Sequence, residues 1–390
     1  MPSWLNKGIL LLSLSAFFAD SGYQMLVAGL PLFIVFALKA PVYAYGIATA
    51  LAYGVGSLFS YLGGVLSDKY SKKKIAIFGN ALIATLSFTG MSSNAAEAIS
   101  LFSIGWWFRN FRTPARRAMQ SDLSKKEHRG KAFGFLHALD ILGAVTASLI
   151  LIFLLSLHLG FKYIFLISSI PIAISTILLF PVKEKKVRNE KARINRVVEA
   201  SRINKKVFAG IIFSTALYGF SSYSLGFPIL TISQRSSEAN GIWAYILMTL
   251  VSAVAGFLIG SSKANKVRLL GILGYALGGV GSLLIGVAYE EILGKEMFYV
   301  AVSLIGISLG AIETLEPTII SIVSKAKEHG RSMGALTTSR SIGLFASNIL
   351  MGLLYSIGPF YSYFYASILS ITAFFVLIIF GMGYKERSAR

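Results

Sequence analysis

Six charged side chains stand inside otherwise apolar stretches of this sequence. They are four acids and two bases: Asp20, Arg109, Asp140, Glu313, Glu316 and Arg340. Insertion scales assign about 2.5–3.5 kcal/mol to such a residue at the centre of a membrane helix, so these side chains are expected to face a protein interior or a wet cavity. In that setting, ionisable groups can exchange protons, pair with one another or hold a charged ligand.

The stretch FLHALDILGAV carries two of the candidate groups. His137 and Asp140 are three residues apart, so a helix would place them on one face. Burial disfavours the charged form of an unpaired carboxylate, which suits reversible protonation, and a nearby Arg109 would oppose protonation while it is paired. Asp20 and Asp140 are therefore predicted to carry a proton. The alternative is a permanent pair between an aspartate and an arginine that only holds helices together.

The stretch GAIETLEPTII, residues 310–320, holds two acids on one face of a predicted helix. Glu313 and Glu316 are close enough to share a proton or hold a cation, and Pro317 frees a backbone carbonyl one turn earlier. Pairing with arginines such as Arg112 or Arg116 is the alternative. The stretch supplies no His or Cys, so no iron or zinc site is predicted.

The elements that position these groups are predicted membrane helices. The chain has 390 residues, of which 55% are hydrophobic and 14% charged, against about 25% charged residues in soluble domains. Apolar segments long enough to cross a bilayer recur, and the first is too long for a signal peptide. Twelve spans are predicted, at about 8–36, 42–66, 74–93, 96–119, 131–158, 161–181, 207–232, 242–262, 269–289, 297–323, 332–356 and 359–383.

The placement of the 37 Lys and Arg residues predicts the orientation of these spans. Most fall at the two ends, in the long central loop and in the loops on one side; the loops on the other side hold Lys39, Lys162, Arg235 and Lys295. Positive loops stay in the cytoplasm, so a multi-pass protein of the plasma membrane with both termini cytoplasmic is predicted. The basic loops are expected to lie against anionic lipid headgroups rather than to bind nucleic acid.

The sequence repeats itself about one central linker. GKAFGFLHALDILG (130–143) aligns with GRSMGALTTSRSIG (330–343) at an offset of 200, so that Asp140 falls on Arg340. Gly22, Gly29 and Pro31 likewise fall on Gly219, Gly226 and Pro228. We predict an N-terminal six-helix bundle (1–182), a cytoplasmic linker (183–206) and a C-terminal six-helix bundle (207–390). Two such halves suit alternating access, in which one rocks against the other.

The loop after the second span resembles a family signature. GVLSDKYSKKK (64–74) is similar to the Gly-x-Leu-x-Asp-Arg-x-Gly-Arg-Lys motif of the major facilitator superfamily, with Ser71 in place of the second glycine. Arg109 resembles the arginine of that family's fourth helix. The resemblance implies an all-α polytopic fold of twelve transmembrane helices in two pseudo-symmetric bundles.

The resemblance also implies roles for particular residues. Asp68 would act as a conformational latch against the start of helix 11 in the outward-open state; the expected latch residues are Gly64, Asp68, Lys69, Lys72, Arg112 and Asp122. In this family helices 1, 4, 7 and 10 line a central cavity. The expected cavity aromatics are Tyr23, Trp107, Tyr218 and Tyr223, and the alternative for each is ordinary packing.

These features predict a secondary active transporter. The chain has no cysteine and no nucleotide-binding or hydrolase motif, so no enzyme and no cofactor is predicted, and a proton gradient is the expected energy source. The leading prediction is a monomeric, proton-coupled antiporter that exports a small hydrophobic organic cation or drug-like molecule, because acids outnumber bases among the six buried charges. The alternative is an organic anion or a sugar-like metabolite, bound by Arg109 and Arg340. A metal exporter and a lipid scramblase are weaker alternatives.

Overall fold

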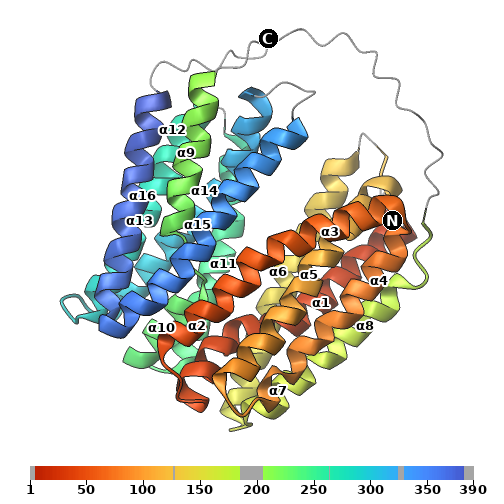
Figure 1. Ribbon diagram of the computed structural model, residues 1–390, viewed down its shortest axis with the longest axis horizontal. Helices are drawn as coiled ribbons and strands as arrows, with labels where there is room; N and C mark the ends of the chain where they lie inside the picture. The colour runs from red at the N-terminus through yellow and green to blue at the C-terminus, as the bar shows by residue number, and fades with distance from the viewer. Residues whose placement is uncertain (1–4, 126–127, 185–204, 263, 324–328, 382–390) are drawn as a thin grey trace. The chain divides into compact units, whose positions relative to one another are not determined.

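The computed structural model describes residues 5–125, 128–184, 205–262, 264–323 and 329–381, and the regular elements in these ranges are helices. The chain divides into two compact units, Met1–Ile194 (unit 1) and Asn195–Arg390 (unit 2). The division falls inside the expected linker 183–206, most of which lies outside the described residues. In Figure 1 the helices of each unit are gathered into a bundle of their own.

Unit 1 is built from long helices, some of which change pitch along their length. Its α-helices are α1 (Lys7–Leu32), α2 (Val42–Ala50), α3 (Gly56–Lys69), α4 (Lys72–Leu82), α5 (Ala95–Leu123), α6 (Arg129–Ser156), α7 (Phe161–Ile167) and α8 (Ser169–Leu179). A π-helical turn at Phe33–Ala37 extends α1, and another at Leu51–Val55 joins α2 to α3. A 3₁₀ segment, Ile83–Met91, extends α4.

Unit 2 repeats this plan with one clear difference. Its α-helices are α9 (Lys205–Ser221), α10 (Gly226–Arg235), α11 (Glu238–Ser261), α12 (Lys266–Leu269), α13 (Leu277–Tyr289), α14 (Met297–Val323), α15 (His329–Ile357) and α16 (Pro359–Gly381). A π-helical segment, Leu270–Ala276, joins α12 to α13. The seventh predicted span is broken between α9 and α10, whereas the first continues through Pro31.

The break in the seventh span has a local cause. Pro228 lies in the first turn of α10, where a missing backbone N–H costs least, so the proline suits a new helix start. The backbone N–H of Ser224, just before that start, donates to Oδ1 of Asn348 on α15 at 2.9 Å. The side chain of Asn348 therefore satisfies a donor that a continuous helix would have used.

Ten helices in the described part of the chain are long and apolar enough to cross a membrane. The two remaining predicted spans correspond to α5 and to the broken pair α9 and α10. Helix α9 is only 17 residues long. Helix α5 carries a dense group of arginines: Arg109, Arg112, Arg116 and Arg117. The fold is therefore all-α and polytopic, and the arginine-rich span α5 packs against α3 and α4.

Helices at equivalent places in the two units pack against equivalent neighbours. In unit 1, α1 packs against α6 and α8, while α5 packs against α3 and α4. In unit 2, α9 packs against α15 and α16, while α14 packs against α11 and α13. The sequence repeat is thus also a repeat of helix contacts.

Glycines of the repeat lie where these helices approach most closely. A Cβ atom on Gly143 of α6 would lie 2.5 Å from the carbonyl oxygen of Phe17 on α1. On α15, a Cβ atom on Gly343 would lie 2.5 Å from the backbone of Gly219 on α9. Small residues allow membrane helices to approach at the backbone. The matched glycines therefore account for the matched contacts.

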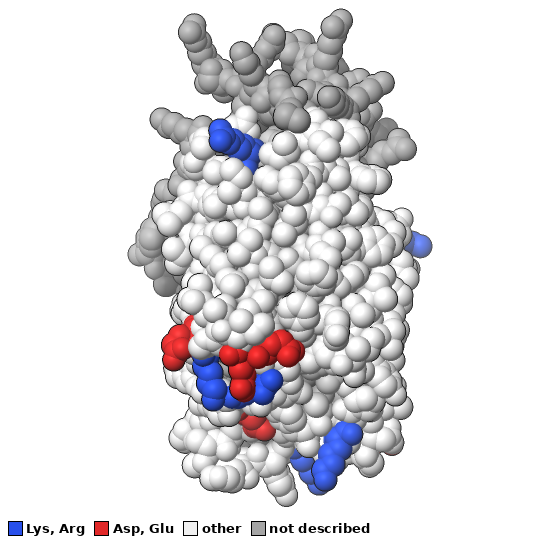
Figure 2. Space-filling model, turned by 90° about the vertical axis from the view of Figure 1, so that its left-hand side faces the viewer, with Lys and Arg blue, Asp and Glu red and all other residues white. Residues whose placement is uncertain are grey.

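The outer surface of unit 2 fits a lipid environment. Along α16, the large apolar side chains of Phe364, Ile368, Phe375 and Ile379 are all exposed and recur at helical spacing. Figure 2 shows a broad surface almost free of charged side chains, with acidic and basic side chains gathered toward the lower end of the view and further basic ones near the upper end and at the right-hand edge. This distribution is the one expected when hydrocarbon covers the middle of a helix bundle and water covers its ends.

Candidate functional site

A cluster of buried polar side chains joins α1 and α5 inside unit 1. The hydroxyl group of Tyr23 donates to Oδ1 of Asp20, and both residues are at most 4% exposed. The guanidinium group of Arg109 lies over two rings, 5.4 Å from the centroid of Tyr23 and 5.0 Å from that of Trp106. Its Nη2 also lies 3.5 Å from the Tyr23 hydroxyl oxygen. Tyr23 therefore links the carboxylate of Asp20 to the positive charge of Arg109.

Arg112 extends this cluster toward α4 and α8. Its Nη1 donates to Oδ1 of Asn80 on α4, and the residue is 1% exposed. The amide group of Asn80 in turn donates to Thr176 Oγ1 at 2.8 Å and to Ser175 Oγ at 3.1 Å, both on α8. Arg112, which was expected in the latch, thus lies in the buried interior of unit 1.

Arg116 supplies the partner of Asp140. Its Nη2 lies 3.5 Å from Oδ1 of Asp140 on α6, and the two side chains are 7% and 25% exposed. The sequence argument did not place Arg116 near Asp140, although its spacing from Arg109 and Arg112 puts all three on one side of α5. His137 lies one turn before Asp140 on α6 and is exposed.

Several atoms of this cluster have no hydrogen-bond partner in the described part of the chain. They are Asp20 Oδ2, Arg109 Nε, Arg112 Nε, and Arg116 Nε and Nη1. A buried polar atom left without a partner costs about 1–3 kcal/mol, and more when its group is charged. The cluster therefore contains binding capacity that the protein's own side chains do not use.

A second cluster lies in unit 2, between α14 and α15. Arg340 of α15 donates to both acids of α14, with Nη1 on Glu313 Oε1 and Nη2 on Glu316 Oε2. Oε1 of Glu316 also accepts from Tyr275 at 2.7 Å and from Thr215 at 2.9 Å. The acids are thus paired with an arginine of their own unit, Arg340, rather than with Arg112 or Arg116. Sequence reasoning missed Thr215 and Tyr275.

The two acids of this cluster have different surroundings. The side chain of Glu316 is 0% exposed and that of Glu313 is 66% exposed. Pro317 lacks a backbone N–H, so the carbonyl group of Glu313 has no helical donor four residues later. Glu316 is a bound structural group, whereas Glu313 presents a carboxylate at the surface of the bundle.

The predicted cavity aromatics occupy different places in their units. Tyr218 is buried, with its ring 5.4 Å from that of Tyr275, and the hydroxyl oxygen of Tyr223 lies 2.9 Å from Ser282 Oγ. The indole N–H of Trp107 donates to the Leu51 carbonyl oxygen at 2.9 Å. Trp107 therefore contacts the second predicted span, while Tyr23 and Tyr218 lie beside the two charged clusters.

The predicted latch region is at the end of unit 1 where α3 leads into α4. Lys72 Nζ and Asp122 Oδ2 are 2.6 Å apart, which links α4 to the end of α5. Gly64 lies against Pro114, and Lys69 lies 5.6 Å from the ring centroid of Tyr70. The side chain of Asp68 and the start of α15 lie outside the described side chains, so the latch contact between them stays a prediction.

One acid at this end was missed by the sequence reasoning. The carboxylate of Glu184 accepts from Ser71 Oγ at 2.5 Å and from the backbone N–H of Lys72 at 2.7 Å. A carboxylate at a helix N-terminus satisfies free amide groups there and is favoured by the helix dipole. Glu184 therefore ties the end of the α8 segment to the loop that carries the signature motif.

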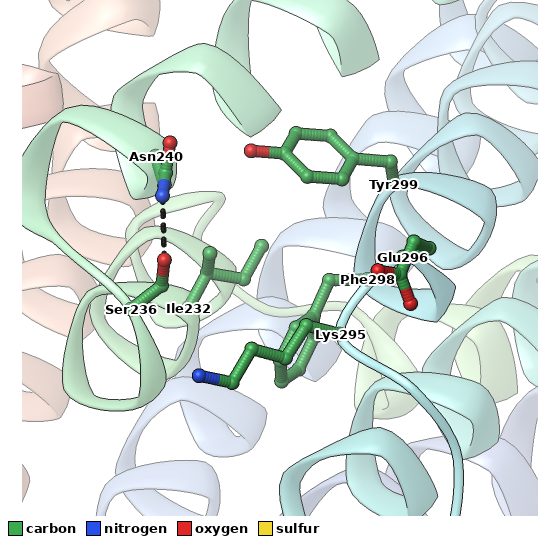
Figure 3. Close-up of a pocket in the computed structure, with 7 residues that line it drawn as sticks. All are labelled: Ile232, Ser236, Asn240, Lys295, Glu296, Phe298 and Tyr299. Carbon is green, nitrogen blue, oxygen red and sulfur yellow. Dashed lines mark hydrogen bonds between the residues drawn. The ribbon is translucent and has the colours of Figure 1, made fainter.

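The described part of the chain also contains a small recess in unit 2, remote in sequence from these charges. It has a volume of about 140 Å³ and is lined by Ile232, Ser236, Asn240, Lys295, Glu296, Phe298 and Tyr299. Figure 3 shows the amide group of Asn240 bonded to Ser236, with the ring of Tyr299 across the space from them. None of the predicted site residues lines this recess. Within the described residues, no three His, Cys, Asp or Glu side chains are grouped so as to hold a metal ion.

Comparison with known proteins identifies the family. The family model of the Major Facilitator Superfamily matches residues 12–347, so the chain belongs to that superfamily. The uncharacterized MFS-type transporter MJ1317 of Methanocaldococcus jannaschii is 26% identical over 386 residues, which cover 96% of this chain and 95% of that protein. The multi-drug resistance efflux pump PmrA of Streptococcus pneumoniae is 25% identical over 71% of this chain and 69% of the pump.

Solved structures support the same fold. The xylose transporter XylE of E. coli, in an inward-open conformation, matches with a TM-score of 0.75 at 13% identity, over 98% of this chain and 97% of that one. The nucleoside transporter NupG matches with a TM-score of 0.74 at 13% identity, over 97% and 100%. The protein is therefore a multi-pass membrane transporter of the major facilitator fold.

Proposed function

We propose that the protein is a secondary active transporter that works by alternating access and is driven by protons, with Asp20 as the coupling carboxylate. The observation that carries the proposal is the incomplete hydrogen bonding of the buried Asp20 carboxylate. One carboxylate oxygen accepts from Tyr23, and the other has no partner in the described part of the chain. Asp140, Arg116 and Arg109 all lie close enough to act on its charge. A buried carboxylate near a second acid and two bases gains or loses a proton when the transport cycle moves those neighbours.

The proposed direction is export of a small hydrophobic or drug-like molecule. The 25% identity to an efflux pump of Streptococcus pneumoniae supports this choice. An organic cation could meet the exposed carboxylate of Glu313, the acid in unit 2 that has only Arg340 as a partner among the described residues. We also propose that the protein acts as a monomer, since one chain supplies both halves that alternating access requires. Its basic termini face the cytoplasm. The Lys72–Asp122 pair belongs to the conformational latch.

An organic anion is the second candidate, because the buried charges are not those expected from the sequence. The expectation of an excess of acids counted Arg109 and Arg340 as the buried bases. In the structure Arg112 and Arg116 are also buried, at 1% and 6% exposed. The excess of acid therefore disappears, and unit 1 by itself contains more buried arginines than aspartates.

The test of proton coupling uses purified protein in liposomes that contain a pH-sensitive dye. Substrate candidates of each charge class are added under an imposed proton gradient, and Asp20→Asn is compared with wild type. Glu290→Gln, a change in an exposed loop acid, is the matched control. Substrate-dependent proton flux should disappear in Asp20→Asn and persist in the control, while exchange of labelled substrate without a gradient continues. Proton flux equal to wild type in Asp20→Asn would refute the role of Asp20.

A further inference from the structure

Two arginines of α5 keep unused donors inside unit 1. Arg112 and Arg116 are four residues apart, so they lie on the same face of the helix. Arg112 is 1% exposed, and the side chain of Arg116 is 7% exposed. Arg112 Nε, Arg116 Nε and Arg116 Nη1 have no partner in the described part of the chain. The ion pair that Arg116 forms with Asp140 has a separation of 3.5 Å, which is long for a charge-assisted hydrogen bond.

The charges around these arginines do not balance. The positive charges of Arg112 and Arg116 act on one another, so the two guanidinium groups lie in a shared electrostatic environment. With Arg109, they face two buried or half-buried acids, Asp20 and Asp140. Three positive charges therefore meet two negative ones when both acids are ionised. A buried charge needs a partner, so one positive charge of this cluster remains for an anion to balance.

The geometry of the donors indicates the kind of anion. Guanidinium N–H groups donate charge-assisted hydrogen bonds to carboxylate oxygens, and each of these two groups has donors that no described side chain uses. The unpartnered nitrogens belong to two such groups on one helix face. We propose that Arg112 and Arg116 form a buried binding site for the carboxylate group of a small monoanion. This site is independent of proton coupling, because it needs the arginines and not the titration of Asp20.

The carboxylate could come from two sources, which share this chemistry. It could belong to the transported molecule, or to a small organic acid from solution that stays bound while another substrate moves. Acetate and benzoate serve as probes, since both are monoanions with a free carboxylate, and benzamide is the uncharged control.

Binding is tested first, without any gradient. Full-length protein in lipid nanodiscs is titrated with benzoate, and affinity is measured by calorimetry and by the rise in unfolding temperature. Arg116→Gln should weaken binding at least about tenfold, as loss of one member of a buried charge-assisted pair does. Arg116→Lys keeps a positive charge near Asp140 but loses the unpartnered Nε and Nη1 donors, so it should also weaken binding if those donors recognise the ligand. Arg117→Gln, which changes the exposed neighbouring arginine, is the matched control and should bind as wild type does.

Each result has a defined meaning. Benzoate binding that is lost in both Arg116 variants, with Arg117→Gln and benzamide behaving as controls, supports the site. Equal affinity in wild type and Arg116→Gln overturns it, as does binding of benzamide as strong as that of benzoate. Uptake of labelled benzoate into proteoliposomes then separates the two sources, since only a substrate carboxylate is carried across. Loss of proton flux in Asp20→Asn with intact benzoate binding would leave this site standing, so the two proposals fail separately.

Discussion

Units 1 and 2 place an ion pair at the same point of a repeated scaffold, but with opposite polarity. In unit 1, Asp140 of α6 faces Arg116 of α5. In unit 2, Arg340 of α15, at the equivalent place in the repeat, bonds to Glu313 and Glu316 of α14. Both units therefore have a polar link between these two helices, with the acid on α6 in unit 1 and on α14 in unit 2.

The two clusters also differ in how completely their groups are bonded. Glu316 accepts from three side chains, and none of its atoms, nor any of Arg340, is among the buried unpartnered atoms of the described residues. In unit 1, Asp20 and the arginines Arg109, Arg112 and Arg116 each have at least one buried atom without a partner. A fully bonded cluster holds a bundle together, whereas an under-bonded one can exchange partners. This contrast predicts that the unit 2 cluster contributes more to stability, and that the unit 1 cluster is the one whose groups change partners.

The largest expected effect on stability is in the fully bonded cluster of unit 2, around Glu316. Glu316→Gln removes the buried one of the two negative charges that Arg340 faces, and it places an amide N–H₂ group among donors. Breaking a buried pair costs about 3–5 kcal/mol, so the free energy of unfolding should fall by that amount. Denaturant unfolding in mixed micelles measures it. Asp20→Asn in unit 1 should cost under about 1 kcal/mol, because the carboxylate has one bonded oxygen only. Equal losses in the two variants would remove the contrast between the clusters.

The next largest loss of stability is expected at the matched glycines Gly143 and Gly343, and it tests whether the helix contacts of the two units are equivalent. Gly143→Ala and Gly343→Ala should each lower the free energy of unfolding by about 1–3 kcal/mol, because the new methyl group meets backbone atoms of α1 or α9. Gly134→Ala on α6 is the control. A Cβ atom there meets nothing within 4 Å, so this change should stabilise the helix by about 0.5–1 kcal/mol. A neutral result at Gly343 alone would show that the helix contacts of the two units are not matched.

A smaller loss of stability is expected when only one hydrogen bond to Glu316 is removed. Tyr275→Phe removes one of three donors to Glu316 and leaves Thr215 and Arg340 in place. The expected loss is about 1 kcal/mol in the free energy of unfolding, measured in the same way. If this single change cost as much as Glu316→Gln, the tyrosine bond rather than the ion pair would be the main support of the cluster.

The smallest effect on stability is expected at Glu313. Its side chain is 66% exposed, so the pair with Arg340 is screened by solvent and contributes at most about 0.5 kcal/mol. Glu313→Gln should therefore unfold like wild type, while transport of a cationic substrate in proteoliposomes falls. Unchanged transport of cations would favour the anion alternative, in which the arginines of unit 1 select the substrate.

The sequence was sufficient for the architecture because its signals are local or periodic. Apolar length predicted the spans, and the offset of 200 between matched glycines predicted the repeat. The signature around Asp68 predicted the family, which the match over residues 12–347 confirms. Each of the six charges in apolar runs lies in one of the two polar clusters of the structure.

Only the tertiary structure decided which charges meet. From the sequence, Glu313 and Glu316 were expected to share a proton, to hold a cation, or to pair with arginines such as Arg112 or Arg116. The structure pairs them with Arg340. The sequence reasoning likewise left Arg116 out of the six charges within apolar runs, although the residue is buried against Asp140. Pairing depends on how each helix is rotated about its axis and how closely neighbours approach, which is set by packing between segments far apart in the chain. The composition of the sequence and the spacing of its residues do not directly determine that rotation.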